Sequence, residues 1–199
     1  MTARTFDVDD LRTGGHKGPG VRRTGEKLLT YDLAVLAGDV ATVVTAAGGW
    51  LCDRVRAGWR VTVLTPGGAV DTTALTILGV DWAPGTSLSE LPGGHHPTAV
   101  AVDARLLAGC AYTRSALLEI LDGARTEVTV WGESPSLEAG RRFHRVHHRL
   151  SAAARAFKSH AVQACGGPAD LSVEEFHSIA LWYAPDGTDL APAGRPAGT

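Results

Sequence analysis

The 199-residue chain has few cysteines, little net charge and no long apolar run, and each absence excludes a class of protein. Its cysteines, Cys52, Cys110 and Cys165, are too widely spaced for a disulfide framework or a zinc cluster, so we expect buried free thiols in a reducing compartment. The formal net charge of −2 creates no field that would attract nucleic acid or an acidic membrane. No apolar run reaches the roughly 20 residues that span a bilayer, and no signal peptide is visible, so we expect a cytoplasmic protein.

The two ends of the chain differ in composition from the segment between them. Residues 1–27 combine glycine and charged residues without an apolar core segment, and we expect a flexible N-terminal arm. Residues 185–199 are rich in proline, glycine and alanine, and we expect a flexible C-terminal tail. The expected folded domain is therefore 28–184, which is an ordinary size for a single domain.

Within this domain, short apolar runs alternate with longer amphipathic segments. The expected strands are 33–36, 61–64, 80–82 and 127–132, and the expected helices are 43–57, 70–78, 100–107, 113–122 and 137–164, the last as one helix or two. Residues 173–182 are expected to start as a helix and to end as a strand. Such alternation predicts an α/β fold with a parallel sheet.

The clearest unit is the segment 31–68, which reads as a strand, a loop, a helix and a second strand. A unit of this kind places its ligand site at the carboxyl ends of its parallel strands. Asp39 and Thr42 follow the first strand and Thr65 ends the second, so these three are candidate pocket residues. Alternatively, Asp39 caps the following helix and Thr65 caps a turn.

Several short motifs occur in an order that resembles a known enzyme family. They are the pair Gly48-Gly49, the second strand with its approach at 56–65, a Leu-Gly-Val helix end at 78–80, the strand at 126–132, the helix at 157–163 and a Glu-x-Phe element at 174–176. Through these motifs, residues 30–180 resemble the LmbE-like family, also called the PIG-L deacetylases. The resemblance implies a single-domain, Rossmann-like three-layer α/β sandwich. It also implies a zinc-dependent hydrolase that removes N-acyl groups, often from amino sugars.

The chemistry of that family requires a His-Pro-Asp-Asp motif ahead of the Gly-Gly pair. There the His and the second Asp bind zinc, and the first Asp is the base. Counting back from the pair, these positions hold Asp39, Val40, Ala41 and Thr42. Ala41 takes no proton, and the neutral hydroxyl of Thr42 is a poor zinc ligand. The motif that the resemblance implies is therefore absent.

The family's third zinc ligand comes from a loop after the later strand, and here no histidine follows residue 132 until His144. The resemblance therefore implies a degenerate member without the metal or any other cofactor. We expect it to bind a small molecule, or to act as a non-catalytic subunit beside a partner protein or a second copy of itself. Two enzymatic alternatives remain open. One is a metal-independent enzyme that acts on a small sugar- or amino-acid-like substrate through Asp39 and His95 or His96; the other is a deacetylase with atypical metal ligands.

Arginines and histidines concentrate in the segment 141–149, which we expect to be helical. His144 and His148 would share one helix face, but the zincin pattern needs a Glu between such a pair, and here the neighbours are arginines. Because cations repel a metal ion, we interpret the segment as a solvated basic face. As an alternative, a surface for an anion or an acidic protein partner would be formed by Arg141, Arg142, Arg145 and His148.

Overall fold

A computed structural model describes residues 31–91, 96–123, 126–132, 143–167, 173–179 and 190–192. Its elements in chain order are β1 (Asp32–Leu36), α1 (Val40–Arg56), β2 (Arg60–Thr65), α2 (Thr73–Leu78), β3 (Asp81–Pro84), the 3₁₀ helix η2 (Leu88–Glu90), β4 (Ala99–Asp103), α3 (Ala104–Gly109), α4 (Ala111–Gly123), β5 (Glu127–Trp131), β6 (His144–Arg149), α5 (Ala152–Ala164), β7 (Val173–Ser178) and β8 (Ala191–Pro192). No helix in these ranges is long and apolar enough to cross a membrane. The expected N-terminal arm lies outside the described residues.

The strands form one eight-stranded sheet in the order β3-β2-β1-β4-β5-β7-β6-β8. The pairs among β3, β2, β1, β4 and β5 are parallel, whereas β7, β6 and β8 pair antiparallel to their neighbours. The expected α/β fold with a mostly parallel sheet is therefore confirmed. The strand order reverses at β1, because the chain builds outward through β2 and β3 and then returns to pair β4 with the other edge of β1.

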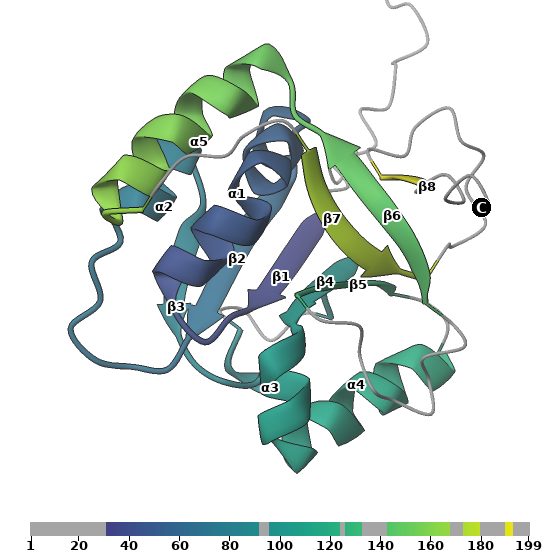
Figure 1. Cartoon of the computed structure of the whole chain (residues 1–199). Coiled ribbons are helices and arrows are strands. Elements are labelled where there is room, and N and C mark those ends of the chain that lie inside the picture. Colours follow the sequence, from purple (N-terminus) through teal and green to yellow (C-terminus); the bar gives the residue numbers. More distant parts are fainter. Residues whose placement is uncertain are drawn as a thin grey trace, which may run out of the picture.

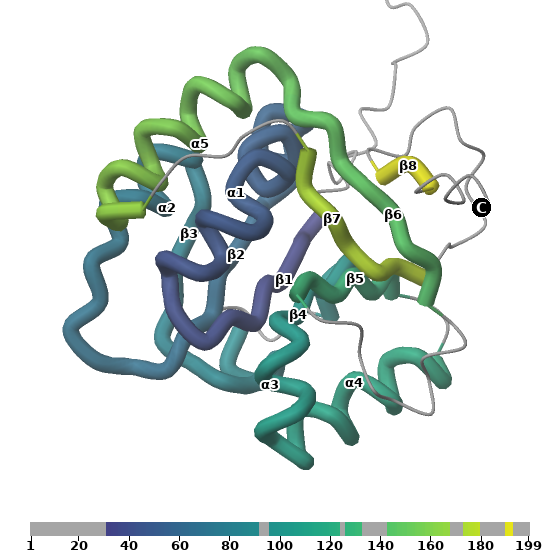
Figure 2. Tube along the Cα trace, viewed as in Figure 1, coloured from purple at the N-terminus to yellow at the C-terminus, as the bar shows by residue number. Residues whose placement is uncertain are grey.

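The parallel strands are apolar on both faces, which is typical of a sheet covered by helices on each side. Along β4, Ala99 and Ala101 pack into one core, whereas Val100 and Val102 pack into the other. Helices α1, α2 and α5 pack on one another over the first face, and α3 and α4 lie on the other side (Figure 1). The tube in Figure 2 shows that α5, from late in the sequence, lies beside α1, from its beginning.

Several expectations about secondary structure are wrong. Residues 144–149 are strand β6 rather than helix, so that only α5 is helical in the described part of 137–164. Residues 173–178 are strand β7 with no helical start, and 99–103 are the central strand β4, which α3 follows at Ala104. In short segments, the spacing of apolar residues that indicates a helix is hard to distinguish from the spacing that indicates a strand. Pairing with strands far away in the sequence then determines which structure forms.

A buried carboxylate fastens the middle of α1 to the rest of the molecule. Glu174, on β7, accepts hydrogen bonds from the backbone N–H groups of Gly49 (2.8 Å) and Trp50 (2.7 Å), and from Nζ of Lys158 on α5 (2.6 Å). Gly49 has no room for a side chain, since a Cβ would lie 2.3 Å from Cδ2 of Leu150. The Gly-Gly pair, the late helix and the Glu-x-Phe element thus meet in one structural contact.

Candidate functional site

The reversal of strand order at β1 identifies the edge of the sheet where a ligand would bind. In open parallel sheets, the binding crevice lies outside the carboxyl ends of the strands at which the order reverses. Here these strands are β1 and β4, which pair in parallel. Asp39 follows β1, Asp103 ends β4, and Arg105 comes two residues later. We call these three side chains the switch-point cluster.

Asp39 is the N-cap of α1. Its Oδ1 accepts a hydrogen bond from the backbone N–H of Thr42 at 2.7 Å, and its Oδ2 accepts one from the Thr42 hydroxyl at 2.8 Å. The positive end of the helix dipole also favours a carboxylate at this position. The Asp39 side chain is still 54% exposed, so its outer side is open to a neighbouring charge or a ligand.

Asp103 is buried, with 2% of its side chain exposed, and Arg105 supplies its partners. Its carboxylate accepts hydrogen bonds from the Arg105 backbone N–H (2.9 Å), from Nε (3.1 Å) and from Nη2 (2.6 Å). The same Nη2 lies 3.8 Å from Oδ2 of Asp39. The hydrogen bonds and the charge of Asp103 raise the pKa of Arg105 further above its ordinary value. One permanent cation therefore lies between the two carboxylates.

The residues at this edge do not fit a catalytic zinc ion. Such a site needs three protein ligands, an open coordination position and a base for the bound water. The cluster offers two carboxylates that are already bonded, the Thr42 hydroxyl is engaged by Asp39, and the base position is Ala41. Among the described residues, no group of three or more His, Cys, Asp or Glu side chains could hold a metal ion.

The other pocket candidates do not join this cluster. Thr65 is buried, and its hydroxyl accepts a hydrogen bond from the indole Nε1 of Trp82 at 2.9 Å. His96 is exposed and precedes β4, so it lies at the amino end of the strand whose carboxyl end carries Asp103. Because β1 and β4 are parallel, the structure does not bring His96 to Asp39. His95 lies outside the described residues.

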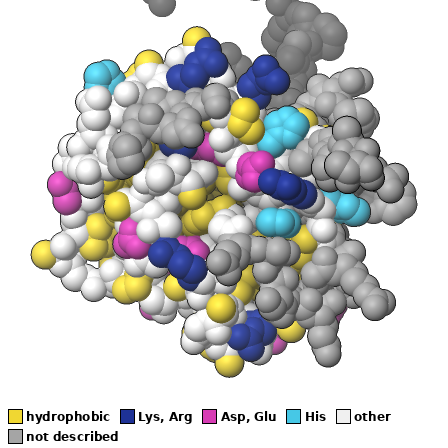
Figure 3. Space-filling model, in the orientation of Figure 1, with side chains coloured by type: hydrophobic (Ala, Val, Ile, Leu, Met, Phe, Trp, Pro, Cys, Tyr) yellow, Lys and Arg dark blue, Asp and Glu magenta, His cyan; other side chains and the backbone are white. Residues whose placement is uncertain are grey.

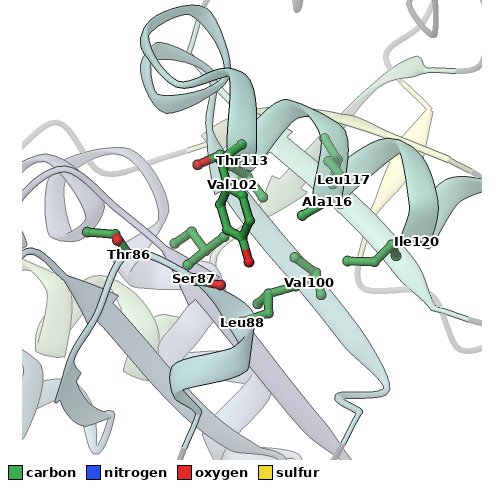
Figure 4. A pocket seen from close by; sticks show the side chains of 11 residues that line it. Thr86, Ser87, Leu88, Val100, Val102, Thr113, Ala116, Leu117 and Ile120 are labelled. Carbon is green, nitrogen blue, oxygen red and sulfur yellow. The ribbon is translucent and has the colours of Figure 1, made fainter.

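A pocket opens on the other side of the same strands, between η2 and α4 (Figure 4). Ser87 and Leu88 face Ala116, Leu117 and Ile120 across it, and side chains of β4 form its floor. The enclosed space is small, with a cavity volume of about 10 Å³. Among the residues that the structure describes, its lining contains aliphatic and hydroxyl side chains but no carboxylate, imidazole or cation. These lining residues therefore supply no metal ligand and no general base.

The basic segment divides between the surface and the interior. Arg145 is exposed and pairs with Glu175 on β7 at 2.6 Å, whereas His148 is buried, with Nε2 2.9 Å from Oδ2 of Asp53. On the described part of the face in Figure 3, Lys and Arg side chains lie beside Asp and Glu side chains rather than in one basic patch. The expected helix is wrong, and His148 is turned into the core. Arg141 and Arg142 lie outside the described residues.

Asp53, His148 and Ser151 have the residue types of a hydrolytic triad but not its geometry. In a triad, the serine hydroxyl bonds the histidine, which in turn bonds the aspartate. Here Oγ of Ser151 (2.6 Å) and Nε2 of His148 (2.9 Å) both bond the Asp53 carboxylate. Ser151 also caps α5 by accepting a hydrogen bond from the Ala154 N–H. The cluster therefore joins α1 to β6 and α5 and has a structural role.

No protein-family model matches this chain, and no curated protein matches it either. Among solved structures, the A40926 pseudoaglycone deacetylase Dbv21 is similar over 79% of this chain and 99% of its own, with 15% identity and a TM-score of 0.54. A triple mutant of a deacetylase from the teicoplanin biosynthetic pathway is similar over 79% and 100%, with 16% identity and a TM-score of 0.52. A deacetylase–teicoplanin complex is similar over 74% and 97%, with 16% identity and a TM-score of 0.52.

The chain has the fold of these deacetylases. At such low identity the likeness extends to the fold alone, and at that level it supports the resemblance to the LmbE-like family. The residues that carry out chemistry must therefore be judged from this chain itself.

Sequence reasoning misses two members of the switch-point cluster, Asp103 and Arg105, because it assigns 100–107 to a helix. The sequence does contain a pattern that indicates the position of Asp103. The apolar run 99–102 ends in an acidic residue, which repeats the arrangement of β1 and Asp39. Recognising that run as a buried parallel strand would have placed Asp103 at the same edge as Asp39.

Proposed function

We propose that this chain is a catalytically degenerate relative of the LmbE-like deacetylases, which acts as a ligand-binding or non-catalytic partner subunit. The observation that carries the proposal is the chemistry of the base and ligand positions. Ala41 accepts no proton, Thr42 is bonded to Asp39, and the guanidinium of Arg105 faces that carboxylate. Unlike a zinc ion, the guanidinium of Arg105 has no open coordination position for a water molecule. It therefore cannot convert a bound water into a nucleophilic hydroxide.

The ligand class we propose is a small polar molecule with neighbouring hydroxyl or amine groups, such as an amino sugar. Asp39 is partly exposed and accepts hydrogen bonds, and Arg105 is 61% exposed and donates them. An acceptor and a donor side by side at the carboxyl ends of β1 and β4 complement adjacent hydroxyl groups. Asp39 and Arg105 would then orient a bound sugar without cleaving it.

Two measurements on the wild-type chain test this proposal. Acetate release from N-acetylglucosamine is followed with and without added Zn²⁺, and we expect none above the rate without protein. Glucosamine is titrated into the ¹⁵N-labelled chain, and we expect saturable amide shifts at residues 38–42. Asp39→Ala should abolish these shifts. Asp32→Ala is the matched control, because it removes a carboxylate at the amino end of β1 and should leave the shifts intact.

Zinc-dependent acetate release that a chelator stops would overturn the degenerate assignment. If glucosamine shifts no amide near Asp39, the proposed ligand class is wrong. If Asp39→Ala and Asp32→Ala weaken binding equally, the ligand binds elsewhere.

A further inference from the structure

We propose that the outer edge of strand β6 is a docking site for an extended, acidic segment of a partner protein, and that β8 is a displaceable strand that covers part of it. The inference deepens the proposed function, on which it rests, because it names the chemistry of a partner for a non-catalytic subunit. The site lies at the antiparallel end of the sheet, away from the switch-point cluster.

The first support is the incomplete pairing of β6. On one side, β7 pairs with all six residues of β6, from His144 to Arg149. On the other side, within the described part of the chain, β8 pairs only with Val146 and His147 (Figure 1). An edge strand presents backbone N–H and C=O groups that can pair with another chain. The edge that β8 leaves uncovered is therefore a template for an added strand.

The second support is that β8 is a minimal strand with one apolar anchor. Both of its residues, Ala191 and Pro192, are exposed. Pro192 has no backbone N–H, so it donates no hydrogen bond to β6. Leu190, which precedes β8, is 8% exposed and belongs to the core on the α1 side of the sheet. The antiparallel register, continued by one residue, sets Leu190 opposite His148. A longer strand with its own apolar residue at that position can therefore displace β8.

The third support is the charge of β6. Five of its six residues carry a guanidinium or an imidazole. Because side chains alternate along a strand, Arg145, His147 and Arg149 share one face. β7 complements this face with Glu175, which lies opposite His147 and pairs with Arg145 at 2.6 Å. Arg149 is exposed and lies opposite Val173, so its β7 neighbour offers it no carboxylate.

β8 does not provide a similar complement on the outer edge. Ala191 lies opposite His147, and neither residue of β8 is charged. A strand with one carboxylate opposite His147, and others two residues before and after it, would also face Arg145 and Arg149. Opposite charges across strands stabilise pairing. Pairing with β6 of a second copy would instead set basic residues opposite one another, so these charges favour an acidic partner.

The probe is a synthetic peptide, Thr-Glu-Leu-Glu-Val-Glu-Thr, with a fluorescent label. In the register of β8, its Leu would replace Leu190 opposite His148, and its three Glu residues would lie opposite Arg149, His147 and Arg145. Fluorescence anisotropy measures its binding to the full chain, and amide shifts of the ¹⁵N-labelled chain locate it. We expect saturable binding, with shifts concentrated at 144–149.

Three variants and one control peptide make the result specific. Leu190→Ser should bind the peptide about tenfold more tightly, because β8 no longer competes for the edge. Arg149→Glu should bind it about tenfold less tightly, since like charges then lie opposite each other. Arg60→Glu is the matched control, because Arg60 is exposed at 57% on β2 and should leave the affinity unchanged. A peptide with Lys in place of each Glu should not bind.

Every outcome decides the proposal. If neither the wild type nor Leu190→Ser binds the acidic peptide, or if the Lys peptide binds equally well, the edge is not a site for an acidic strand. An equal loss in Arg149→Glu and Arg60→Glu would show unspecific charge attraction. If Leu190→Ser binds no more tightly, β8 does not cover the site; should that variant be unfolded by circular dichroism, Leu190→Ala decides by the same criterion.

Dimerisation of Leu190→Ser in light scattering, without peptide binding, would identify a second copy as the occupant and overturn the acidic partner. Failure of the peptide test leaves the absence of acetate release and the binding of glucosamine near Asp39 untouched. Zinc-dependent acetate release would in contrast overturn the proposed function without changing the peptide result.

Discussion

Lys158 and Glu174 form an ion pair in the interior, with 2.6 Å between Nζ and Oε1 and with only 3% and 2% of their side chains exposed. The pair links α5 to β7, and the same carboxylate holds two backbone N–H groups of α1. The middle of α1, the helix that Asp39 caps, is thereby fastened to β7 and α5.

We predict that Glu174→Gln lowers the free energy of unfolding by about 3 kcal/mol, because it leaves the Lys158 ammonium buried without a counter-charge. Lys158→Met should cost a similar amount, and the double variant less than the sum of the two. Urea denaturation measures each value. Arg145→Ala is the control, because its pair with Glu175 is exposed on both sides and should be worth less than about 1 kcal/mol. Equal effects at the two pairs would contradict the structural role of Glu174.

Gly49→Ala should destabilise the chain by about 2 kcal/mol, because its Cβ would overlap Leu150 and crowd Oε1 of Glu174. Gly123→Ala is the matched control at the end of another helix, where nothing lies within 4 Å of a Cβ. It should be neutral or slightly stabilising. Thermal unfolding of both variants measures the difference. A Gly49 variant as stable as the Gly123 variant would show that the close approach of Leu150 is not required.

Stability should depend on pH through Asp53. Burial alone would raise the pKa of this carboxyl, but the hydrogen bonds from Ser151 and His148 outweigh it and hold the pKa below its ordinary value. A lowered folded-state pKa means that the stabilisation is complete above the unfolded pKa of about 3.9 and is lost as the pH falls through the folded value.

Asp53→Asn should therefore reduce stability at pH 7 by about 1–2 kcal/mol, since it removes hydrogen bonds to a charged acceptor. The difference from the wild type should shrink as the pH falls below about 4, because the Asp53 carboxyl is protonated first in the unfolded wild type and then, at its lower pKa, in the folded wild type as well. Urea unfolding at pH 7, 5 and 3 measures it. A difference that grows toward pH 3 would mean that Asp53 does not have a lowered pKa in the folded chain.

The sequence was sufficient for the parallel strands β1, β2, β3 and β5, although not for β4 between β1 and β5, because those four carry their own evidence. The run 61–64 is apolar on both faces and is bounded by glycine and proline, so the strand β2 and the βα unit before it could be predicted locally. Segment 144–149 could not be predicted, because its alternation of buried and exposed residues is set by pairing with β7. His148 looks like a surface residue until α1 brings Asp53 beside it.

The candidate site was only half predictable for a similar reason. Asp39 and Thr42 follow a clear strand and lie at its carboxyl end, as the sequence indicates. Arg105 contacts Asp39 only because β4 pairs with β1, across a separation in sequence that no local pattern reveals. The effect of Arg105 on the chemistry of the site was therefore hidden until the strand order was known.

The metal content of the wild-type chain tests our central claim most directly. The chain is expressed with added Zn²⁺, dialysed against metal-free buffer and analysed by mass spectrometry for zinc per chain. We predict well below one zinc per chain, with no change when a chelator is included in the dialysis. One zinc per chain retained through dialysis, lost on Asp39→Ala and required for amide hydrolysis, would contradict the claim.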